Sequence, residues 1–545
     1  MSDKQPIFIL PENIQRMIGK DAQRNNIMAA RLVADTVKTT LGPKGMDKML
    51  VSSIGDITVT NDGVTILEEM EIEHPAAKMM VEVAKTQEEA VGDGTTTAVI
   101  IAGKLLENAE KLLDEKIHPT VIARGYRMAA EKAQEISNRI AIKITSQQEN
   151  LLKQIVTTAM TGKGAEAAKE KLADIIVGAI RQVMEKTDDG FIVDKNNIKL
   201  EKKKGGGIEN TELVNGIVID KERVNLDMPS SVKNARIALL DVALEIKGPE
   251  TEAKIQITSP DQIQGFLDQE DRVIREMIEK IKKSGANVVL CQKGIDDVAQ
   301  YYLAKSNIFA ARRIKKSDME LIAKATGGRI VSNLNELAQN ELGKASLVKE
   351  MRDGENEGMT YITGCENPKA LTLLIRGGTE HVIDELERAI KDGIGDISAA
   401  IESGYIVAGG GAFEIELAKN LRQFSQTIKG REQLAINAFA DSLEVIPRTL
   451  AENSGLDPID VLTELKSRHD KNEATVGLDT SGSSSEGAGI CDTLKRGIIE
   501  PLEIKIQALK SASEVAVMIL RIDDVIASSS GGSKSGMPEM PSQEY

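Results

Sequence analysis

Apolar residues recur at helical spacing in the first third of the chain and again in its last quarter. This pattern predicts amphipathic helices over residues 21–41, 75–90, 95–113, 119–141, 151–184, 412–424, 431–453 and 458–468. The helical pattern of 151–184 is broken at Gly162-Lys163-Gly164. Two short apolar runs at residues 49–51 and 57–60 are predicted to be paired strands, and Asn61-Asp62-Gly63 after them most simply fits a hairpin turn. Both ends of the chain are therefore expected to be rich in helix.

The middle of the chain alternates short apolar runs with amphipathic segments. Strands are predicted at residues 192–193, 217–218, 237–240, 287–291, 308–311 and 330–331, and helices at 296–305 and 317–325. Ser317 and Glu320 fit a capping box for the second helix. A long helix at 259–283, capped by Ser259, fits either an ordinary core helix or an arm that meets a partner. This alternation predicts an α/β domain inserted into a helix-rich domain that both chain ends build.

Composition narrows the class of protein. The 545 residues carry a net charge of −15, so a basic nucleic-acid or anionic-lipid binding surface is disfavoured. Aromatic residues are 2% of the chain, and the three cysteines form no Cys-x-x-Cys pair, which argues against base stacking and zinc fingers. No apolar run approaches about 18 residues and no signal peptide is visible, so we expect no membrane span and a cytoplasmic protein.

Glycine turns at helix ends are the candidate chemistry. Gly162-Lys163 lacks the Ser or Thr of a phosphate-binding loop of the Walker type, and the dinucleotide fingerprint is absent. Three other turns, however, adjoin predicted helices: residues 40–45, 92–94 and 409–411. Free amides at such helix starts bind anions, and Asp93 is placed where a carboxylate can hold Mg²⁺ against a phosphate. Each turn alone fits a simple cap or loop, but together they predict a phosphate ligand.

Six motifs in one order are then recognisable: LGPKGMDKML (41–50), TNDGVTIL (60–67), GDGTTTAV (92–99), MTGKGAE (160–166), VAGGGAFEIEL (407–417) and RIDDVI (521–526). As a set, spanning residues 11 to about 527, they resemble the group II chaperonins, most closely the archaeal thermosome type. The resemblance implies an ATP-dependent chaperone that folds non-native polypeptides inside two stacked rings of about eight subunits, of one type or mixed with paralogues. A built-in lid would close on ATP hydrolysis.

The resemblance also implies a domain plan. Residues 1–148 and 407–527 would form a helix-rich equatorial ATP-binding domain, and residues 149–218 and 371–406 a small intermediate domain. Residues 219–370 would form an inserted α/β apical domain with a helical protrusion at about 245–283. Residues 528–545 would be a disordered tail.

Site residues carry over from the matching motifs, with ATP and Mg²⁺ as the implied ligands. Asp62 and Asp392 would orient and activate the attacking water, and Asp93 would hold the metal. The residues implied to contact the nucleotide are Thr40, Leu41, Gly42, Pro43, Asn61, Gly94, Thr95, Thr96, Thr97, Lys163, Gly410, Gly411 and Glu500.

One stretch departs from the family pattern. Gly393 and Gly395 stand where the family usually has Ala or apolar residues, and Asp396 shares a helix face with Asp392. Glycines inside a helix cost about 1 kcal/mol each relative to Ala. A misplaced Asp392 would instead give a nucleotide-binding ring scaffold, or holdase, with little hydrolysis. A metabolic enzyme has little support, since no nucleophile–base set is visible.

Overall fold

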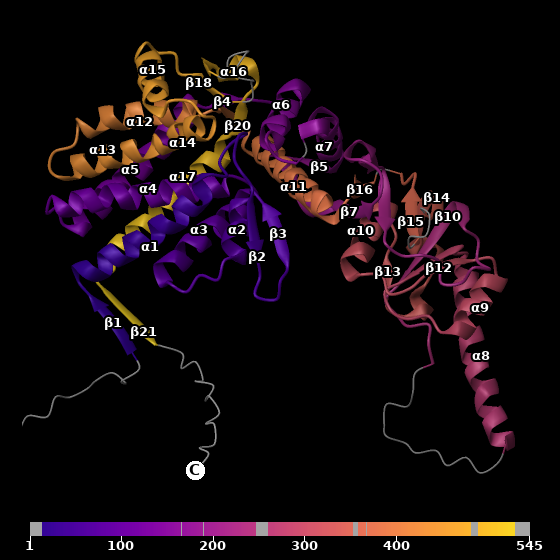
Figure 1. Ribbon diagram of the computed structural model, residues 1–545. Helices are drawn as coiled ribbons and strands as arrows, with labels where there is room; N and C mark the ends of the chain where they lie inside the picture. The colour runs from indigo at the N-terminus through magenta and orange to yellow at the C-terminus, as the bar shows by residue number, and fades with distance from the viewer. Residues whose placement is uncertain are drawn as a thin grey trace, which may run out of the picture. The chain divides into compact units, whose positions relative to one another are not determined.

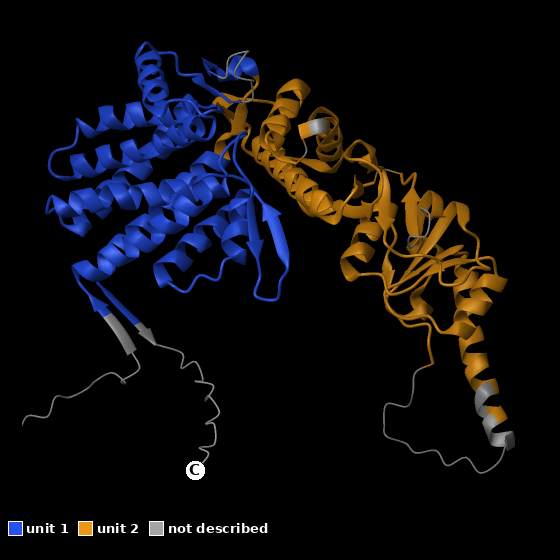
Figure 2. Ribbon diagram, in the orientation of Figure 1, with its two compact units in different colours: residues 1–141, 408–496, 504–545 blue, residues 142–407, 497–503 orange. Residues whose placement is uncertain are grey.

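The computed structural model describes residues 14–164, 166–188, 190–246, 260–352, 358–366, 368–480 and 489–528. The chain divides into two compact units (Figure 2): residues 1–141, 408–496 and 504–545 form the first, and residues 142–407 and 497–503 form the second. Both chain ends thus share one unit and the middle forms another, as the patterns predicted. The further division of the middle and the exact domain bounds stay predictions. Ser259 and the tail beyond Ser528 lie outside the described residues.

The first unit is mainly helical (Figure 1). Its helices are α1 (Lys20–Lys38), α2 (Gly63–Glu69), α3 (Pro75–Val91), α4 (Thr95–Asp114), α5 (Pro119–Ile140), α12 (Ala412–Ser425), α13 (Glu432–Leu443), α14 (Val445–Asn453), α15 (Pro458–Asp470), α16 (Thr493–Arg496) and, from Ile504 on, α17 (Leu502–Leu520). Its antiparallel strand pairs are β1 (Ile14–Ile18) with β21 (Asp524–Ser528), β2 (Lys48–Val51) with β3 (Ile57–Thr60), and β18 (Val476–Asp479) with β19 (Gly489–Asp492).

Helix α4 forms the centre of this unit. Its residues Ala98 to Ala102 are all buried, so it is covered on every side, as a helix that is apolar all round must be. Small residues let its neighbours approach closely, because a Cβ added at Gly103 would overlap Ala34 of α1. The start of α4 is thereby held firmly, and the candidate Gly92–Gly94 turn leads into it.

The second unit contains a mixed sheet and a helical part. Its helices are α6 (Glu149–Met160), α7 (Lys169–Val183), α8 (Pro260–Ser284), α9 (Asp297–Lys305), α10 (Lys316–Thr326) and α11 (Glu380–Ser403). The main sheet has the strand order β12 (Phe309–Ala311), β11 (Val288–Cys291), β10 (Ser231–Leu240), β14 (Gly343–Met351), β15 (Met359–Thr363) and β9 (Gly216–Ile219). Strand β13 (Ile330–Val331) also pairs with β10. Smaller sheets are β7-β16-β8 (Ile198–Lys204, Leu371–Gly377, Glu212–Val214), β20-β17-β4 (Ile499–Pro501, Tyr405–Ala408, Ile142–Lys143) and β5-β6 (Met184–Thr187, Gly190–Val193).

Alternate residues of the main sheet face two different cores. Leu240 packs with Ile274 and Ile278 of α8, whereas Leu239 packs with Ile322 of α10. This is the period of two that a sheet covered on both faces requires. The fold is therefore an α/β layer inserted in a helix-rich chain, as predicted.

Helix α8 changes character along its length. From Ile274 onward its apolar stripe is buried against the sheet, whereas Gln264 and residues 268–270 are exposed. Figure 1 shows this helix running beyond the sheet of its own unit. The core-helix interpretation is confirmed for the C-terminal half. The exposed half extends outward, and its contact with a partner stays a prediction.

Three local predictions were wrong. Asn61-Asp62-Gly63 is not a hairpin turn, because Asp62 is the N-cap of α2. Ser317 forms no capping box, since α10 starts at Lys316 with Lys315 as N-cap. The helix expected over 431–453 is two helices, divided at Glu444, and Pro447 lies in the first turn of the second, where proline is tolerated. Within the described residues, no helix is both long and apolar enough to span a bilayer.

Candidate phosphate-binding site

The turn between α3 and α4 starts a helix that has no side-chain N-cap. Gly92 (φ +87°) ends α3 and Gly94 (φ +77°) is the N-cap of α4, both in the left-handed region that glycine adopts without strain. Because the N-cap is a glycine, no N-cap side chain pairs with the first-turn amides of α4. Thr95 and Thr96, in that turn, add hydroxyls. Unlike α2, α3 and α5, which begin at a side-chain cap, α4 therefore presents an anion-binding end.

Asp62 starts a second helix directed at the same place. Its Oδ2 accepts hydrogen bonds from Thr65 N (2.9 Å) and Thr65 Oγ1 (2.6 Å). The next residue, Gly63, approaches the start of α4 so closely that an added Cβ would lie 2.5 Å from Thr96 Oγ1. Predicted residues Asn61 and Asp62 are thus brought beside the predicted Thr95–Thr97 segment, within one unit.

Helix α14 holds the other two glycine turns of the first unit. A Cβ added at Gly42 would overlap Leu450, and Asn453 Nδ2 donates to Leu41 O at 2.9 Å. A Cβ added at Gly411 would lie 2.6 Å from Pro447 Cβ. One helix therefore supports both the residue 40–43 turn and the start of α12.

The turn before α12 is also fixed by strand β18. Leu478 N donates to Gly410 O at 2.8 Å, and Thr493 Oγ1 donates to Gly409 O at 3.1 Å. Gly411 (φ +80°) is the N-cap of α12, so this helix, like α4, has no capping side chain at its start. The structure thus places a second uncapped helix N-terminus among the predicted residues.

Helix α17 contacts both the start of α12 and the turn between α3 and α4. Lys505 forms a buried ion pair with Glu414 in the first turn of α12 (2.9 Å). The neighbouring Ile504 O accepts from Gln87 Nε2 (3.2 Å), which also donates to Asp93 O (2.9 Å). Sequence reasoning missed Gln87, Leu450, Pro447 and Asn453, because their contacts join segments far apart in the chain and no local spacing signals them.

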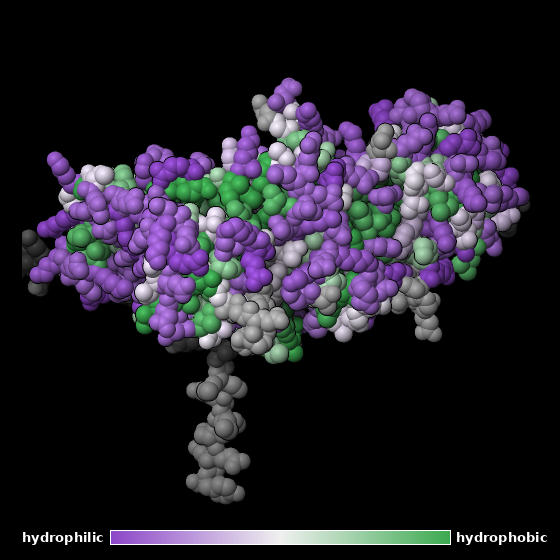
Figure 3. Space-filling model, turned by 90° about the horizontal axis from the view of Figure 1, so that it is seen from above, coloured by the Kyte–Doolittle hydropathy of each residue, from purple (hydrophilic) through white to green (hydrophobic). Residues whose placement is uncertain are grey.

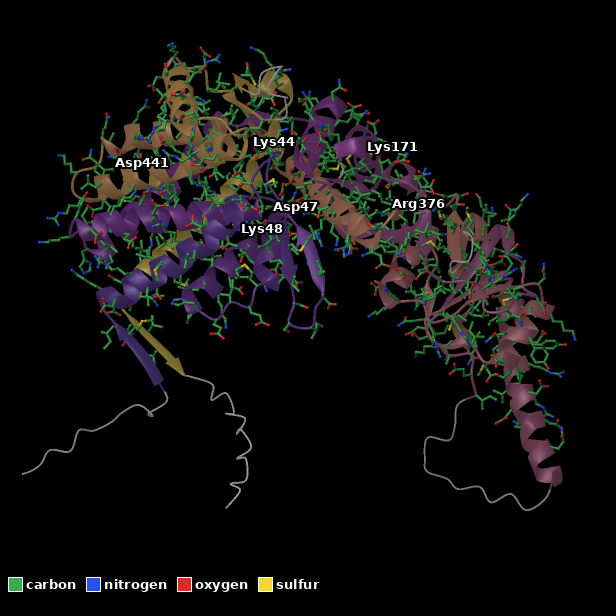
Figure 4. All side chains as sticks on the ribbon, in the orientation of Figure 1. Lys44, Asp47, Lys48, Lys171, Arg376 and Asp441 are labelled. Carbon is green, nitrogen blue, oxygen red and sulfur yellow. The ribbon has the colours of Figure 1, made fainter. Side chains whose placement is uncertain are left out.

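Charged residues follow the residue 40–43 turn toward β2. Figure 4 labels Lys44, Asp47 and Lys48 there, and Lys44 is exposed. An exposed lysine directly after Pro43 leaves a positive charge free for an anion near the turn.

The remaining predicted residues, Lys163, Asp392 and Glu500, belong to the second unit. Lys163, in the turn after α6, forms an ion pair with Asp392 of α11, and both side chains are mostly buried. Glu500 lies on β20, which is attached to α6 because Ile499 N donates to Thr158 Oγ1 (3.4 Å). One helix–turn region thus carries Lys163 and anchors the strand of Glu500.

The unusual glycine beside Asp392 has a packing reason. Helix α11 continues without a break through Gly393, whose added Cβ would lie 3.1 Å from Val156 of α6 and 3.2 Å from Ile176 of α7. Gly393 therefore permits close helix packing rather than loosening α11. Asp396, one turn further on, is 4% exposed.

The donor set fits Mg²⁺ and phosphate. Position 94 must be glycine for packing reasons, because an added Cβ would lie only 2.7 Å from Ile504 Cγ2. Among the residues that the structure describes, no group of three or more His, Cys, Asp or Glu could hold a metal alone. Asp93 supplies a carboxylate in the turn before α4, and Mg²⁺ commonly binds through one or two carboxylates with phosphate oxygens and water.

Comparisons with known proteins agree on one family. A model described as the TCP-1/cpn60 chaperonin family matches residues 33–530. A thermosome subunit of Methanopyrus kandleri is 60% identical over 525 residues, covering 96% of this chain and 95% of that protein. Thermosome subunit beta of Archaeoglobus fulgidus is 56% identical over 543 residues, covering 98% of each chain. A solved open-state monomer of a group II chaperonin from Methanococcoides burtonii is similar to 79% of this chain and all of that one, at 46% identity and a TM-score of 0.59.

Proposed function

The chain belongs to the TCP-1/cpn60 chaperonin family and is an ATP-dependent chaperone of the group II type. From this premise we propose that it hydrolyses Mg²⁺-ATP to fold non-native polypeptides inside a double ring. The observation that carries the proposal is the pair of glycine-capped helices, α4 and α12, in one unit, with Asp62 at the start of α2 next to the start of α4. Uncapped helix starts with adjacent hydroxyls bind polyphosphate. We place the protein in the cytoplasm.

The residues would divide the work of phosphoryl transfer. The amides and hydroxyls of Gly94 to Thr97 would hold the phosphates, with Thr40–Pro43, Asn61, Gly410 and Gly411 lining the nucleotide and Glu500 meeting the ribose. Asp93 would hold Mg²⁺, which when bound neutralises phosphate charge. Lys163 would meet the γ-phosphate, releasing Asp392. Asp62 and Asp392 would then orient the attacking water and accept its proton.

An exposed apolar hairpin supports self-association. Six large apolar side chains are exposed in β2, in β3, in their connection and at Met46 just before β2: Met46 70%, Met49 67%, Val51 64%, Ile54 84%, Ile57 51% and Val59 40%. A lone two-stranded hairpin is marginal in water, and clustered exposed apolar residues mark contact sites. Elsewhere, the face in Figure 3 is mostly hydrophilic with separate apolar patches. We assign the hairpin to contact with another copy of the chain in the ring.

Two measurements on one preparation test this function. Light scattering should give about sixteen subunits, two rings of about eight. The same particles should then recover a chemically unfolded test enzyme with Mg²⁺-ATP, but not with Mg²⁺-ADP.

The variant Met49→Lys should lower the mass of the particles, whereas Met518→Lys, exposed but outside the hairpin, should not. A stable monomer, or recovery that needs no ATP, would contradict the proposal; rings that bind clients without turnover would instead indicate a holdase.

A further inference from the structure

Gln87 is a completely buried amide that touches the turn of the proposed metal ligand. It lies on α3, one turn before that helix ends, and its exposure is 0%. Its Nε2 is 2.9 Å from Asp93 O and 3.2 Å from Ile504 O. Both partners are carbonyl oxygens, which only accept, so the NH₂ group must face them.

The other end of the same amide is unsatisfied. Gln87 Oε1 is buried and has no hydrogen-bond partner among the described residues. Buried acceptors without partners are rare and destabilising. The contacts that Gln87 makes through its amide are therefore those of its N–H donors.

The segment that Gln87 contacts is a glycine turn. Asp93 stands between Gly92 and Gly94, which both adopt left-handed backbone conformations that glycine tolerates without strain. The Gln87 hydrogen bond fixes the carbonyl of Asp93, and the second bond ties the same amide to α17. Ile504 itself lies against Gly94, so the turn is held from one side by α3 and α17 together.

We propose that Gln87 is a positioning residue, which aims the Asp93 carboxylate at Mg²⁺ by hydrogen-bonding the Asp93 and Ile504 carbonyls. This inference rests on the proposed function, because Asp93 is a metal ligand only there. Residues that orient a metal ligand through such hydrogen bonds commonly change metal affinity by roughly 10- to 100-fold when removed. The effect should be largest on the Mg²⁺-dependent part of nucleotide binding, since the direct hydrogen bond of Gln87 in this turn is to Asp93.

Titration of the assembled protein with a fluorescent ADP analogue tests this, first in EDTA and then against increasing Mg²⁺. Gln87→Met removes both donors at similar volume. It should keep the metal-free affinity and need roughly 10- to 100-fold more Mg²⁺ for the half-maximal increase in ADP affinity. Gln87→Leu, which also lacks both donors, should behave like Gln87→Met and serves if the methionine variant does not fold. Glu89→Gln, exposed on the same helix, should match the wild type.

Each other outcome overturns a definite statement. Wild-type Mg²⁺ dependence in both Gln87 variants would overturn the positioning role. An equal loss of affinity in EDTA and in Mg²⁺ would also overturn it, because Gln87 would then only support the fold. A wild-type protein that binds no nucleotide in either condition would overturn the proposed function itself.

Discussion

The two units hold their candidate residues by different kinds of contact. In the first unit, the glycine turns are fixed by backbone hydrogen bonds and close packing, as between Gly410 and Leu478. In the second, Lys163 and Asp392 are held to each other by a side-chain ion pair. Close backbone packing resists rearrangement, whereas the partner of a charged side chain can be exchanged for another charge. We therefore put forward the hypothesis that the packed turns of the first unit are a fixed part of the site and the Lys163–Asp392 pair a switchable part.

The largest expected effect comes from breaking the fixed part. Gly410→Ala places a Cβ against the backbone oxygen of Leu478 at a φ of +63°. The conformational and steric costs together should lower the free energy of unfolding by about 3 kcal/mol and abolish ADP binding. Gly455→Ala is the matched control, because Gly455 has a similar φ (+72°) but no atom near its added Cβ. Equal stability losses in thermal unfolding of the two variants would show that the turn is not packed as described.

Asp62 allows catalysis to be separated from structure within the fixed part. Both Asp62→Asn and Asp62→Ala should lose ATP hydrolysis by about 10²- to 10⁴-fold, because the water loses its base. Asparagine caps a helix as well as aspartate, so only the alanine variant should also lose about 1 kcal/mol of stability. Steady-state hydrolysis and denaturant unfolding measure the two effects. Retained hydrolysis in the asparagine variant would remove Asp62 from the mechanism.

The switchable part is tested by a double-mutant cycle on Lys163→Met and Asp392→Asn. Without nucleotide, the pair should show a coupling free energy of about 1–2 kcal/mol in denaturant unfolding. With a non-hydrolysable ATP analogue and Mg²⁺, the coupling should shrink, because Lys163 would bind phosphate instead. A coupling unchanged by nucleotide would mean that the pair is structural and does not switch.

The smallest effect concerns Glu416, which supports α12 behind the Gly410–Gly411 turn. Burial raises the pKa of Glu416, but hydrogen bonds from His469 and Asn420 and the charge of Lys419 outweigh it, so its pKa is lowered from 4.5. A lowered carboxyl pKa stabilises the fold above its unfolded value and loses that contribution as pH falls through the folded value. Glu416→Gln should therefore cost about 1 kcal/mol at pH 7. The difference in free energy of unfolding between Glu416→Gln and wild type should vanish below the lowered pKa of Glu416. A difference that stays constant down to acid unfolding would contradict the stabilising role of the ionised Glu416 carboxylate.

Local signals explain what the sequence could predict. The strand pair 49–51 with 57–60 was confirmed, and α4 starts at Thr95 as predicted, because glycine, proline and helical spacing act over a few residues. The prediction of a turn at Asn61–Gly63 was wrong because Asp and Gly serve as turn residues and as helix starts alike. Only the contact of this segment with α4 distinguishes a helix start from a turn.

Long-range packing explains the rest. The sequence places Gln87 inside an ordinary amphipathic helix, and nothing nearby indicates that Ile504, more than 400 residues later, supplies its second acceptor. Gly393 likewise suggested a weakened helix, whereas contacts with α6 and α7 make it a packing site. The ligand roles of the candidate residues rest on family resemblance and remain proposals.

The most direct test is to measure ATP binding and ATP hydrolysis side by side on Asp392→Asn and on the wild type, in assembled particles with Mg²⁺. The account predicts wild-type affinity, since Asp392 is proposed to orient the attacking water and not to hold the nucleotide, and hydrolysis lower by about 10²-fold or more. Hydrolysis at the wild-type rate would contradict the assignment of Asp392 and direct the same test to Asp396.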